Sequence, residues 1–243
     1  MNLLIVILGI VVVLLCYWIY TIYTATPILL NNTYLGAIKK ESPQTIAPKT
    51  ISDPYSSKYT IGFWMYINTF SASIGNNFMY YGLYDATNPK AICSFSMDAT
   101  KPILSTSILT GTGTNTSLQT IQITDNLPIQ SWVYIVVSVS STYADCYLNG
   151  KLIVSQQLAQ PSVSIPVNTN PDAPKPTINL VGGPNVDVYV TKLMRLSYPI
   201  DPQTTWMYYN QGNGNPSFSG AGSAYHLEID LTKDSNKWSW KVF

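Results

Sequence analysis

Residues 145–158 of this sequence, DCYLNGKLIVSQQL, constrain the fold more than any other stretch. Asn149-Gly150 stands between two short segments that mix apolar and polar residues. Asn-Gly is the preferred pair for a two-residue type I′ turn, because both central positions of that turn have positive φ. The stretch therefore predicts an antiparallel β-hairpin whose structural turn is formed by Asn149 and Gly150.

The segment before the hairpin, SWVYIVVSVS at 131–140, is apolar through most of its middle. A continuous apolar run of this kind is typical of a central strand that is covered on both faces. Further strands are expected where β-branched and aromatic residues recur between turn residues. These strands are predicted at 59–68, 78–84, 90–98, 102–109, 117–124, 177–183, 186–198 and 225–231.

One short helix interrupts the strands, in YPIDPQTTWMYYNQG at 198–212. Asp201 can cap it, Pro202 suits its first position and Gly212 can end it. Many short antiparallel strands with one short helix predict an all-β fold, a β-sandwich of the jelly-roll kind. The predicted core comprises Ile61, Phe63, Trp132, Ile135, Val137, Val139, Tyr147, Leu152, Val188, Val190 and Leu193.

The N-terminus carries an apolar run without charge or proline at residues 3–23. At ~1.5 Å per residue, a helix of this length spans roughly the ~30 Å of a bilayer core. We therefore expect a single transmembrane helix. A cleaved signal peptide is the alternative; the absence of Lys or Arg before the run and its length disfavour it, while Thr24-Ala25-Thr26 keeps it open. The expected membrane-anchor residues include Leu3, Ile10, Leu15, Trp18 and Tyr23.

Three segments follow from these patterns: a transmembrane helix with its flank at 1–26, a Pro-containing stalk at 27–57, and a sandwich domain with a C-terminal tail at 58–243. The first charged residues, Lys39 and Lys40, follow the helix, which places the large domain on the cytoplasmic side. Charged residues make up only 10% of the chain, and the net charge is +1. A nucleic-acid partner is therefore not expected, and the polar surface suits an assembly or contact with sugars.

Four pieces in order carry a family resemblance: TIGFW at 60–64, the Trp-led strand at 131–140 that runs into YLNGKL at 147–152, the Gly-Gly turn with its strand at 180–200, and the short helix at 200–212. Together they resemble the concanavalin A-like, laminin-G-type jelly roll. With the N-terminal helix, the architecture is also similar to minor capsid proteins of large DNA viruses, which link an inner membrane to a capsid shell. That resemblance implies a non-enzymatic, single-pass membrane protein of the virion, with the lipid bilayer and capsid proteins as partners.

A glycoside hydrolase is one alternative. A retaining enzyme of that class needs two carboxyl groups about 5 Å apart. Glu228 and Asp230 fall on one face of a predicted strand together with His226, the only histidine, and these three are the best catalytic candidates. The related glucanases carry a third acid in the same strand, and this chain lacks it. We therefore expect no enzymatic activity.

A membrane-tethered lectin is the other alternative. Tyr80, Tyr81 and Tyr84 are its candidate glycan-binding residues, since sugar sites use aromatic faces. The lectin hypothesis predicts an exported domain with sugar on Asn31 or Asn115, and it allows a disulfide between Cys93 and Cys146. No Cys/His cluster has the spacing of metal ligands, so neither a metal nor a cofactor is expected.

Overall fold

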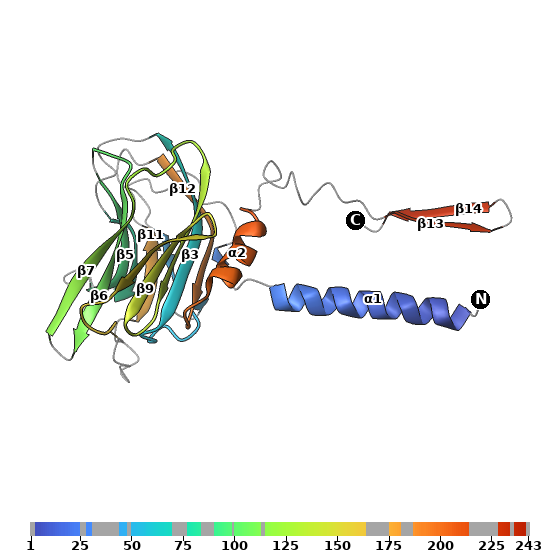
Figure 1. Cartoon of the computed structure of the whole chain (residues 1–243), viewed down its shortest axis with the longest axis horizontal. Helices are drawn as coiled ribbons and strands as arrows, with labels where there is room; N and C mark the ends of the chain where they lie inside the picture. The colour runs from blue at the N-terminus through green and yellow to red at the C-terminus, as the bar shows by residue number, and fades with distance from the viewer. Residues whose placement is uncertain are drawn as a thin grey trace.

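The computed structural model of the chain has a two-layered β-sandwich, an N-terminal helix and a C-terminal hairpin (Figure 1). Helix α1 is Leu3–Thr24, and helix α2 is Pro202–Asn210. The structure describes residues 3–24, 28–30, 44–47, 50–69, 77–83, 90–98, 100–112, 115–163, 175–180, 187–213, 228–233 and 236–241.

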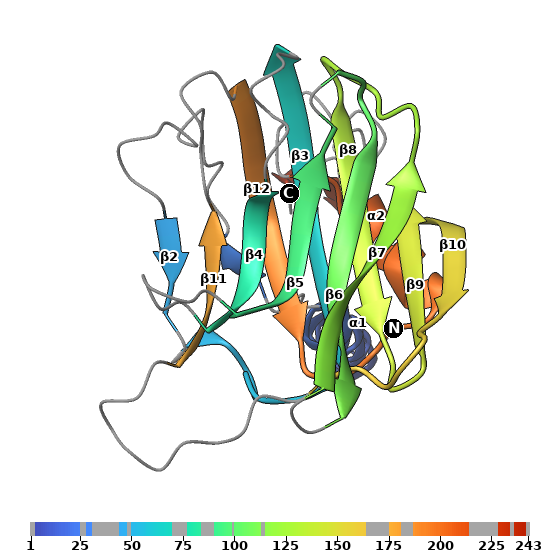
Figure 2. The same ribbon diagram turned by 90° about the vertical axis from the view of Figure 1, so that its left-hand side faces the viewer.

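Two antiparallel sheets face each other (Figure 2), and the described residues form six strands in each. In spatial order, sheet A comprises β1 (Ile28–Leu30), β12 (Asp187–Leu196), β3 (Tyr59–Thr69), β8 (Trp132–Val139), β9 (Tyr143–Leu148) and β10 (Lys151–Gln157). Sheet B comprises β2 (Gln44–Ile46), β11 (Pro176–Leu180), β4 (Asn77–Leu83), β5 (Lys90–Met97), β6 (Leu104–Thr112) and β7 (Asn115–Thr124). The predicted all-β sandwich is confirmed.

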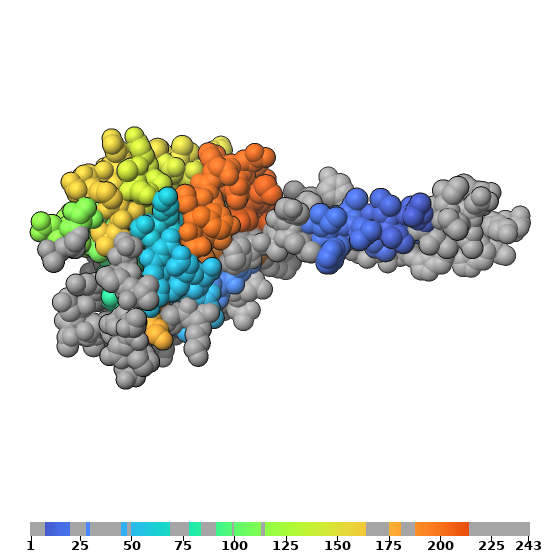
Figure 3. All heavy atoms as spheres, turned by 90° about the horizontal axis from the view of Figure 1, so that it is seen from below, coloured from blue at the N-terminus to red at the C-terminus, as the bar shows by residue number. Residues whose placement is uncertain are grey.

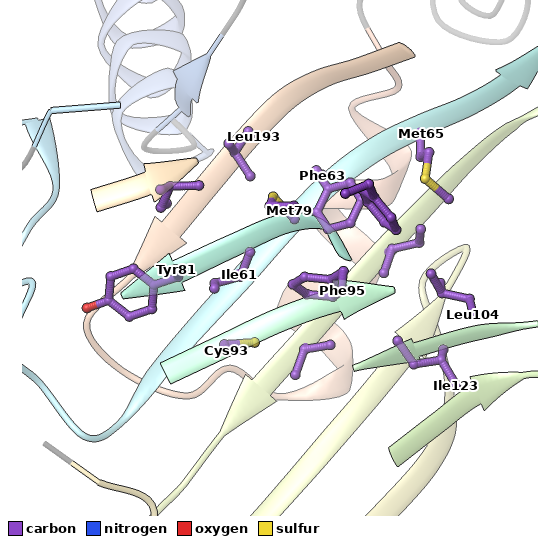
Figure 4. Close-up of a cluster of buried hydrophobic side chains, with 14 of the residues drawn as sticks. Ile61, Phe63, Met65, Met79, Tyr81, Cys93, Phe95, Leu104, Ile123 and Leu193 are labelled. Carbon is purple, nitrogen blue, oxygen red and sulfur yellow. The ribbon is translucent and has the colours of Figure 1, made fainter. Parts of the chain in front are cut away.

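The core lies between the sheets, where alternate residues of each strand point inward. Phe63 of β3 contacts Phe95 of β5 edge to face, with ring centroids 5.1 Å apart (Figure 4). Three predicted core residues lie elsewhere, because the sequence does not show which face is covered. Tyr147 is buried, but in a second apolar cluster on the outer face of sheet A. Trp132 is only half-buried, on the outer face of sheet A, and Leu152 is 46% exposed on the edge strand β10.

Strand β8 is covered on both faces, as its unbroken apolar run predicts. Its inward residues lie in the core, and α2 packs over the outer face of sheet A (Figure 1). Asp201 caps α2, accepting a hydrogen bond from the backbone N–H of Thr204 at 3.0 Å. Ser138 of β8 holds the segment before the helix: its Oγ accepts from Ile200 N–H at 2.9 Å and lies 3.2 Å from Ile200 O.

The segment predicted as a stalk contributes to both sheets, which corrects the start of the sandwich. Strand β1 pairs with β12 at the edge of sheet A, and β2 pairs with β11 at the edge of sheet B. Proline interrupts regular structure where it stands, but a strand of three residues fits between the prolines when the edge strand of a sheet is free to pair with it. The sandwich therefore begins before residue 58.

Helix α1 coincides with the predicted apolar segment. Among the residues that the structure describes, no helix combines the length and the apolar character that crossing a membrane requires. The structure thus confirms a helix here and does not confirm that it spans a membrane. At the other end of the chain, β13 (Glu228–Lys233) and β14 (Asn236–Lys241) form a separate two-stranded sheet.

Candidate functional site

The Asn149-Gly150 turn lies between strand β8 and helix α2. Both residues have positive φ, 49° and 76°, as the type I′ prediction requires. The side-chain oxygen of Asn149 accepts a hydrogen bond from Tyr134 N–H at 2.9 Å, and its backbone N–H donates to Tyr134 O at 2.8 Å. A Cβ at Gly150 would lie 2.7 Å from the ring of Trp206, so the turn needs glycine for two reasons.

Aromatic side chains fill the space between sheet A and α2. Tyr209 of the helix stacks on Trp64 of β3, with ring centroids 5.5 Å apart and 21° between the planes. Trp64 also contacts Tyr134 at 5.2 Å, and both side chains are buried. Burial raises the pKa of Tyr134, so this hydroxyl stays protonated. This layer is a second hydrophobic core that fixes the helix to the sheet.

Beyond this layer, three half-buried rings cross three neighbouring strands of sheet A: Tyr66 of β3, Trp132 of β8 and Tyr189 of β12. Tyr66 lies directly opposite both of the others in the strand register. Its ring centroid is 5.5 Å from that of Trp132 and 5.9 Å from that of Tyr189. We name these three residues the aromatic row. Half-buried rings at fixed spacing offer flat apolar faces that a sugar or a protein loop can contact.

A buried arginine holds the segment that precedes β3. Arg195 is 1% exposed, and its guanidinium lies 5.0 Å from the ring centroid of Tyr81. It donates hydrogen bonds to the backbone oxygens of Ser52 and Asp53 and to the Tyr81 hydroxyl. Tyr81 in turn donates to the backbone oxygen of Pro54. Arg195 belongs to β12 of sheet A and Tyr81 to β4 of sheet B, so the network fixes residues 52–54 against both sheets and has a structural role.

The predicted glycan-binding tyrosines do not form one surface. Tyr81 is 1% exposed and belongs to the arginine network, so its ring cannot stack on a sugar in the folded protein. Tyr80 is half-buried and, as the next residue in β4, points to the opposite face. Tyr84 lies outside the described residues. The two described candidates are therefore not brought together.

The predicted catalytic carboxylates lie in the separate hairpin. Glu228 and Asp230 occupy alternate positions of β13, opposite Lys241 and Ser239 of β14. His226 lies outside the described residues. Within the described part of the chain, no group of three or more His, Cys, Asp or Glu side chains is placed to hold a metal ion.

The two core cysteines are free thiols in this structure. Burial raises the pKa of Cys93 to about 11 and that of Cys146 to about 12. Because the thiolate is the reactive form, neither residue is suited to act as a nucleophile near neutral pH.

The predicted anchor residues whose side chains are described lie at the surface. Ile10, Leu15 and Trp18 are each at least half exposed, and all described side chains of α1, residues 8–19, are exposed. Figure 3 shows this part of α1 projecting beyond the sandwich. Leu3 lies in the first turn of α1, and Tyr23 lies in its last turn.

Sequence reasoning missed the aromatic row. Each of its residues occupies the outward face of a predicted strand, where aromatic residues are less expected than polar ones. Tyr66 lies among the outward positions of YTIGFWMYIN, which alternate with the inward Phe63 and Met65. The sequence does show aromatic residues at outward positions of several predicted strands, which could have indicated an aromatic surface. The order of the strands in sheet A, which the sequence does not show, makes these residues neighbours.

Solved structures similar to this chain include a single-residue mutant of HCR/D, with 12% sequence identity and a TM-score of 0.51 over 76% of this chain and 44% of that one. The binding domain of botulinum neurotoxin DC, in complex with rat synaptotagmin II, has 15% identity and a TM-score of 0.49 over 75% and 45%. Trypanosoma rangeli sialidase, in complex with sialic acid, has 13% identity and a TM-score of 0.43 over 65% and 24%.

This chain spans less than half the length of each of these structures, and at such low identity the likeness concerns the fold alone. No curated protein matches the sequence at a significant level. A family model described as the concanavalin A-like lectin/glucanases superfamily matches residues 40–173, which include strands β2 to β10 of the sandwich. The chain belongs to the concanavalin A-like lectin/glucanases superfamily.

Proposed function

We propose that this chain is a non-enzymatic structural protein that α1 holds at a lipid bilayer while the sandwich binds protein neighbours. The exposed apolar surface of α1 carries the proposal. The described large apolar side chains of this helix are 45–66% exposed, and no charged residue interrupts residues 3–23. Burying one such side chain is worth about 1.5–3 kcal/mol, so a medium that covers the whole helix is strongly favoured over water.

The sandwich offers an apolar surface for protein neighbours. Leu152 and Ile153 of the edge strand β10 are exposed, as are Trp206 and Met207 of α2. Helix α2 contacts β10, so the two pairs lie on neighbouring elements. We name them the β10–α2 surface. An edge strand with exposed apolar residues is a common place for another chain to bind.

The kind of assembly follows from the resemblance to minor capsid proteins of large DNA viruses. On this proposal, the bilayer is the inner membrane of a virion, and the neighbours are capsid proteins. The sandwich then lies on the side equivalent to the cytoplasm. The low content of charged residues, 10% of the chain, supports a surface that is largely covered in an assembly.

Flotation of the full chain with phosphatidylcholine vesicles tests the membrane part. Leu14 of α1 and Leu118 of β7 are both exposed leucines, so L14R and L118R are matched variants. An arginine in the hydrocarbon costs about 2.5–3.5 kcal/mol, so we expect L14R to lower the bound fraction about 100-fold and L118R to leave it unchanged. A wild-type chain that stays with the soluble fraction contradicts the proposal.

Cross-linking with mass spectrometry on the native membranes or particles tests the protein neighbours. We expect reproducible links from the sandwich to a few abundant proteins, and fewer links when Leu152 and Trp206 are both changed to serine. The matched control changes Tyr143 and Tyr198, which are also exposed, to serine. A sandwich without intermolecular links contradicts the scaffold role.

Glycan binding is a second candidate function, and the aromatic row favours it. Sugar rings commonly pack against partly exposed aromatic rings such as these. A glycan array with the wild-type chain, W132A and W206A separates this candidate from the first. If the row binds glycans, W132A loses the signal and W206A keeps it. Equal signals from both variants contradict a role of the row.

A further inference from the structure

The C-terminal hairpin separates its apolar residues from its charged residues by position. In the strand register, Ile229 lies opposite Trp240, and Leu231 lies opposite Trp238. Since alternate positions of a strand share a face, these four positions lie on one face of the hairpin. We name them the hairpin apolar face.

The opposite face carries the charged positions. Glu228 lies opposite Lys241, Asp230 opposite Ser239, and Thr232 opposite Lys237. The two acidic and two basic residues on this face balance each other. The remaining pair, Lys233 and Asn236, shares the side of the apolar face but lies at the turn end of the hairpin. Such a charge balance suits water or a zwitterionic surface and gives no preference for an anionic partner.

Strands β13 and β14 pair with each other and with no other strand that the structure describes. A two-stranded hairpin by itself is marginally stable in water, since it has no third strand or helix to cover its apolar side. An apolar face of four residues, two of them tryptophan, therefore needs a cover.

We propose that the hairpin apolar face lies in the interfacial layer of the same bilayer that holds α1; this inference rests on the proposed function. The hairpin and α1 extend from the same side of the sandwich (Figure 1). Tryptophan is the residue that most favours the membrane–water interface, because its ring is apolar and its N–H is polar. The charged positions then fall on the face of the hairpin away from the lipid.

Tryptophan quenching in vesicles tests the proposal with the full chain. The chain has six tryptophans, at positions 18, 64, 132, 206, 238 and 240. The probe is phosphatidylcholine brominated high in its acyl chains, which quenches only rings that touch the lipid. The variant W238F/W240F keeps the apolar face and removes its emission, and W206F is the control on α2.

If Trp18, Trp238 and Trp240 contact lipid, W238F/W240F lowers the quenched emission about threefold, while W206F leaves it unchanged. A second pair of variants tests the face itself. I229S/L231S removes two apolar positions next to the tryptophans and is expected to reduce their quenching. D230N/K237Q changes the charged face and is expected to leave it as in the wild type.

The outcomes distinguish the inference from the function on which it rests. If the chain does not float with the vesicles, the membrane role fails and the hairpin proposal fails with it. If the chain floats and W238F/W240F is quenched as strongly as the wild type, only the hairpin proposal is overturned. The apolar face then covers a protein surface, such as the sandwich or a second copy of the chain.

Discussion

Asn149 binds Tyr134 through both its main chain and its side chain. Its N–H donates to the Tyr134 carbonyl at 2.8 Å, and its Oδ1 accepts from the Tyr134 N–H at 2.9 Å. The turn between β9 and β10 is thereby fixed to the central strand β8, on the face that α2 covers. The β9–β10 hairpin is therefore part of the second hydrophobic core, between sheet A and α2, and not only a connection between two strands.

Replacing Asn149 with alanine is expected to destabilise the sandwich. The change removes the acceptor of the Tyr134 N–H and puts alanine at a φ of 49°. We expect a loss of about 2–3 kcal/mol in the free energy of unfolding, measured by urea denaturation. N149D keeps an acceptor and should lose less, and N126A, at an exposed loop position, should change stability little. Equal stabilities of N149A and N126A would show that the double contact contributes nothing.

Gly150 and Gly212 form a matched pair that separates backbone strain from close contact. Both have positive φ, 76° and 68°, but only at Gly150 would a Cβ meet neighbours, with Trp206 at 2.7 Å. G212A is expected to cost about 1 kcal/mol through its conformation, and G150A about 2–4 kcal/mol because α2 must also shift. Thermal unfolding of both variants measures the difference. A smaller loss for G150A than for G212A contradicts the close approach of the helix.

Arg195 is expected to hold the N-terminal segment against the sandwich. R195M removes the donors to the oxygens of Ser52 and Asp53 without changing the length of the side chain greatly. We expect a loss of about 2–4 kcal/mol, because buried acceptors remain without donors. Limited proteolysis should cut near residues 50–58 faster in R195M. K192M, on the same strand, is the control, and equal cleavage of both variants would refute this role.

The stability of the sandwich is expected to fall at alkaline pH. Burial raises the pKa of Tyr81 from 10.0 to about 12 and that of Cys93 from 9.0 to about 11. The folded chain therefore holds these protons more tightly than the unfolded chain does. The stability they contribute is complete below about pH 9 and is lost as the pH rises towards about 12.

Y81F tests this dependence, because it removes one of the titrating groups. The shift in the pKa of Tyr81 corresponds to about 3 kcal/mol of folding stability that is lost between about pH 10 and pH 12. Urea denaturation at several pH values from 8 to 12 should give a shallower fall for Y81F than for the wild type, even though the variant is less stable at neutral pH. Y143F, at an exposed ring, is the control. A wild-type slope in Y81F would mean that another group carries the alkaline loss.

Local sequence determined most of the strands, the α2 cap and the Asn149-Gly150 turn, because these depend on neighbouring residues. A type I′ turn needs positive φ at both central positions, which favours Asn-Gly wherever the pair occurs. The Asp201 side chain caps α2 through a backbone N–H only three residues further on. The unbroken apolar run of β8 also indicated that both of its faces are covered. The resemblance of four ordered pieces to the laminin-G-type jelly roll pointed to the family that the match over residues 40–173 shows.

Only the tertiary structure decided which residues become neighbours across strands. Tyr66, Trp132 and Tyr189 form a row because β12, β3 and β8 are adjacent in sheet A, although these residues are far apart in the sequence. The same holds for Tyr81, which alternation alone cannot assign to a glycan surface or to Arg195. It holds too for the segment before residue 58, whose short strands exist only because β12 and β11 offer free edges. Local patterns fix turns and periods, whereas sheet order and the covering of each face depend on contacts between distant parts of the chain.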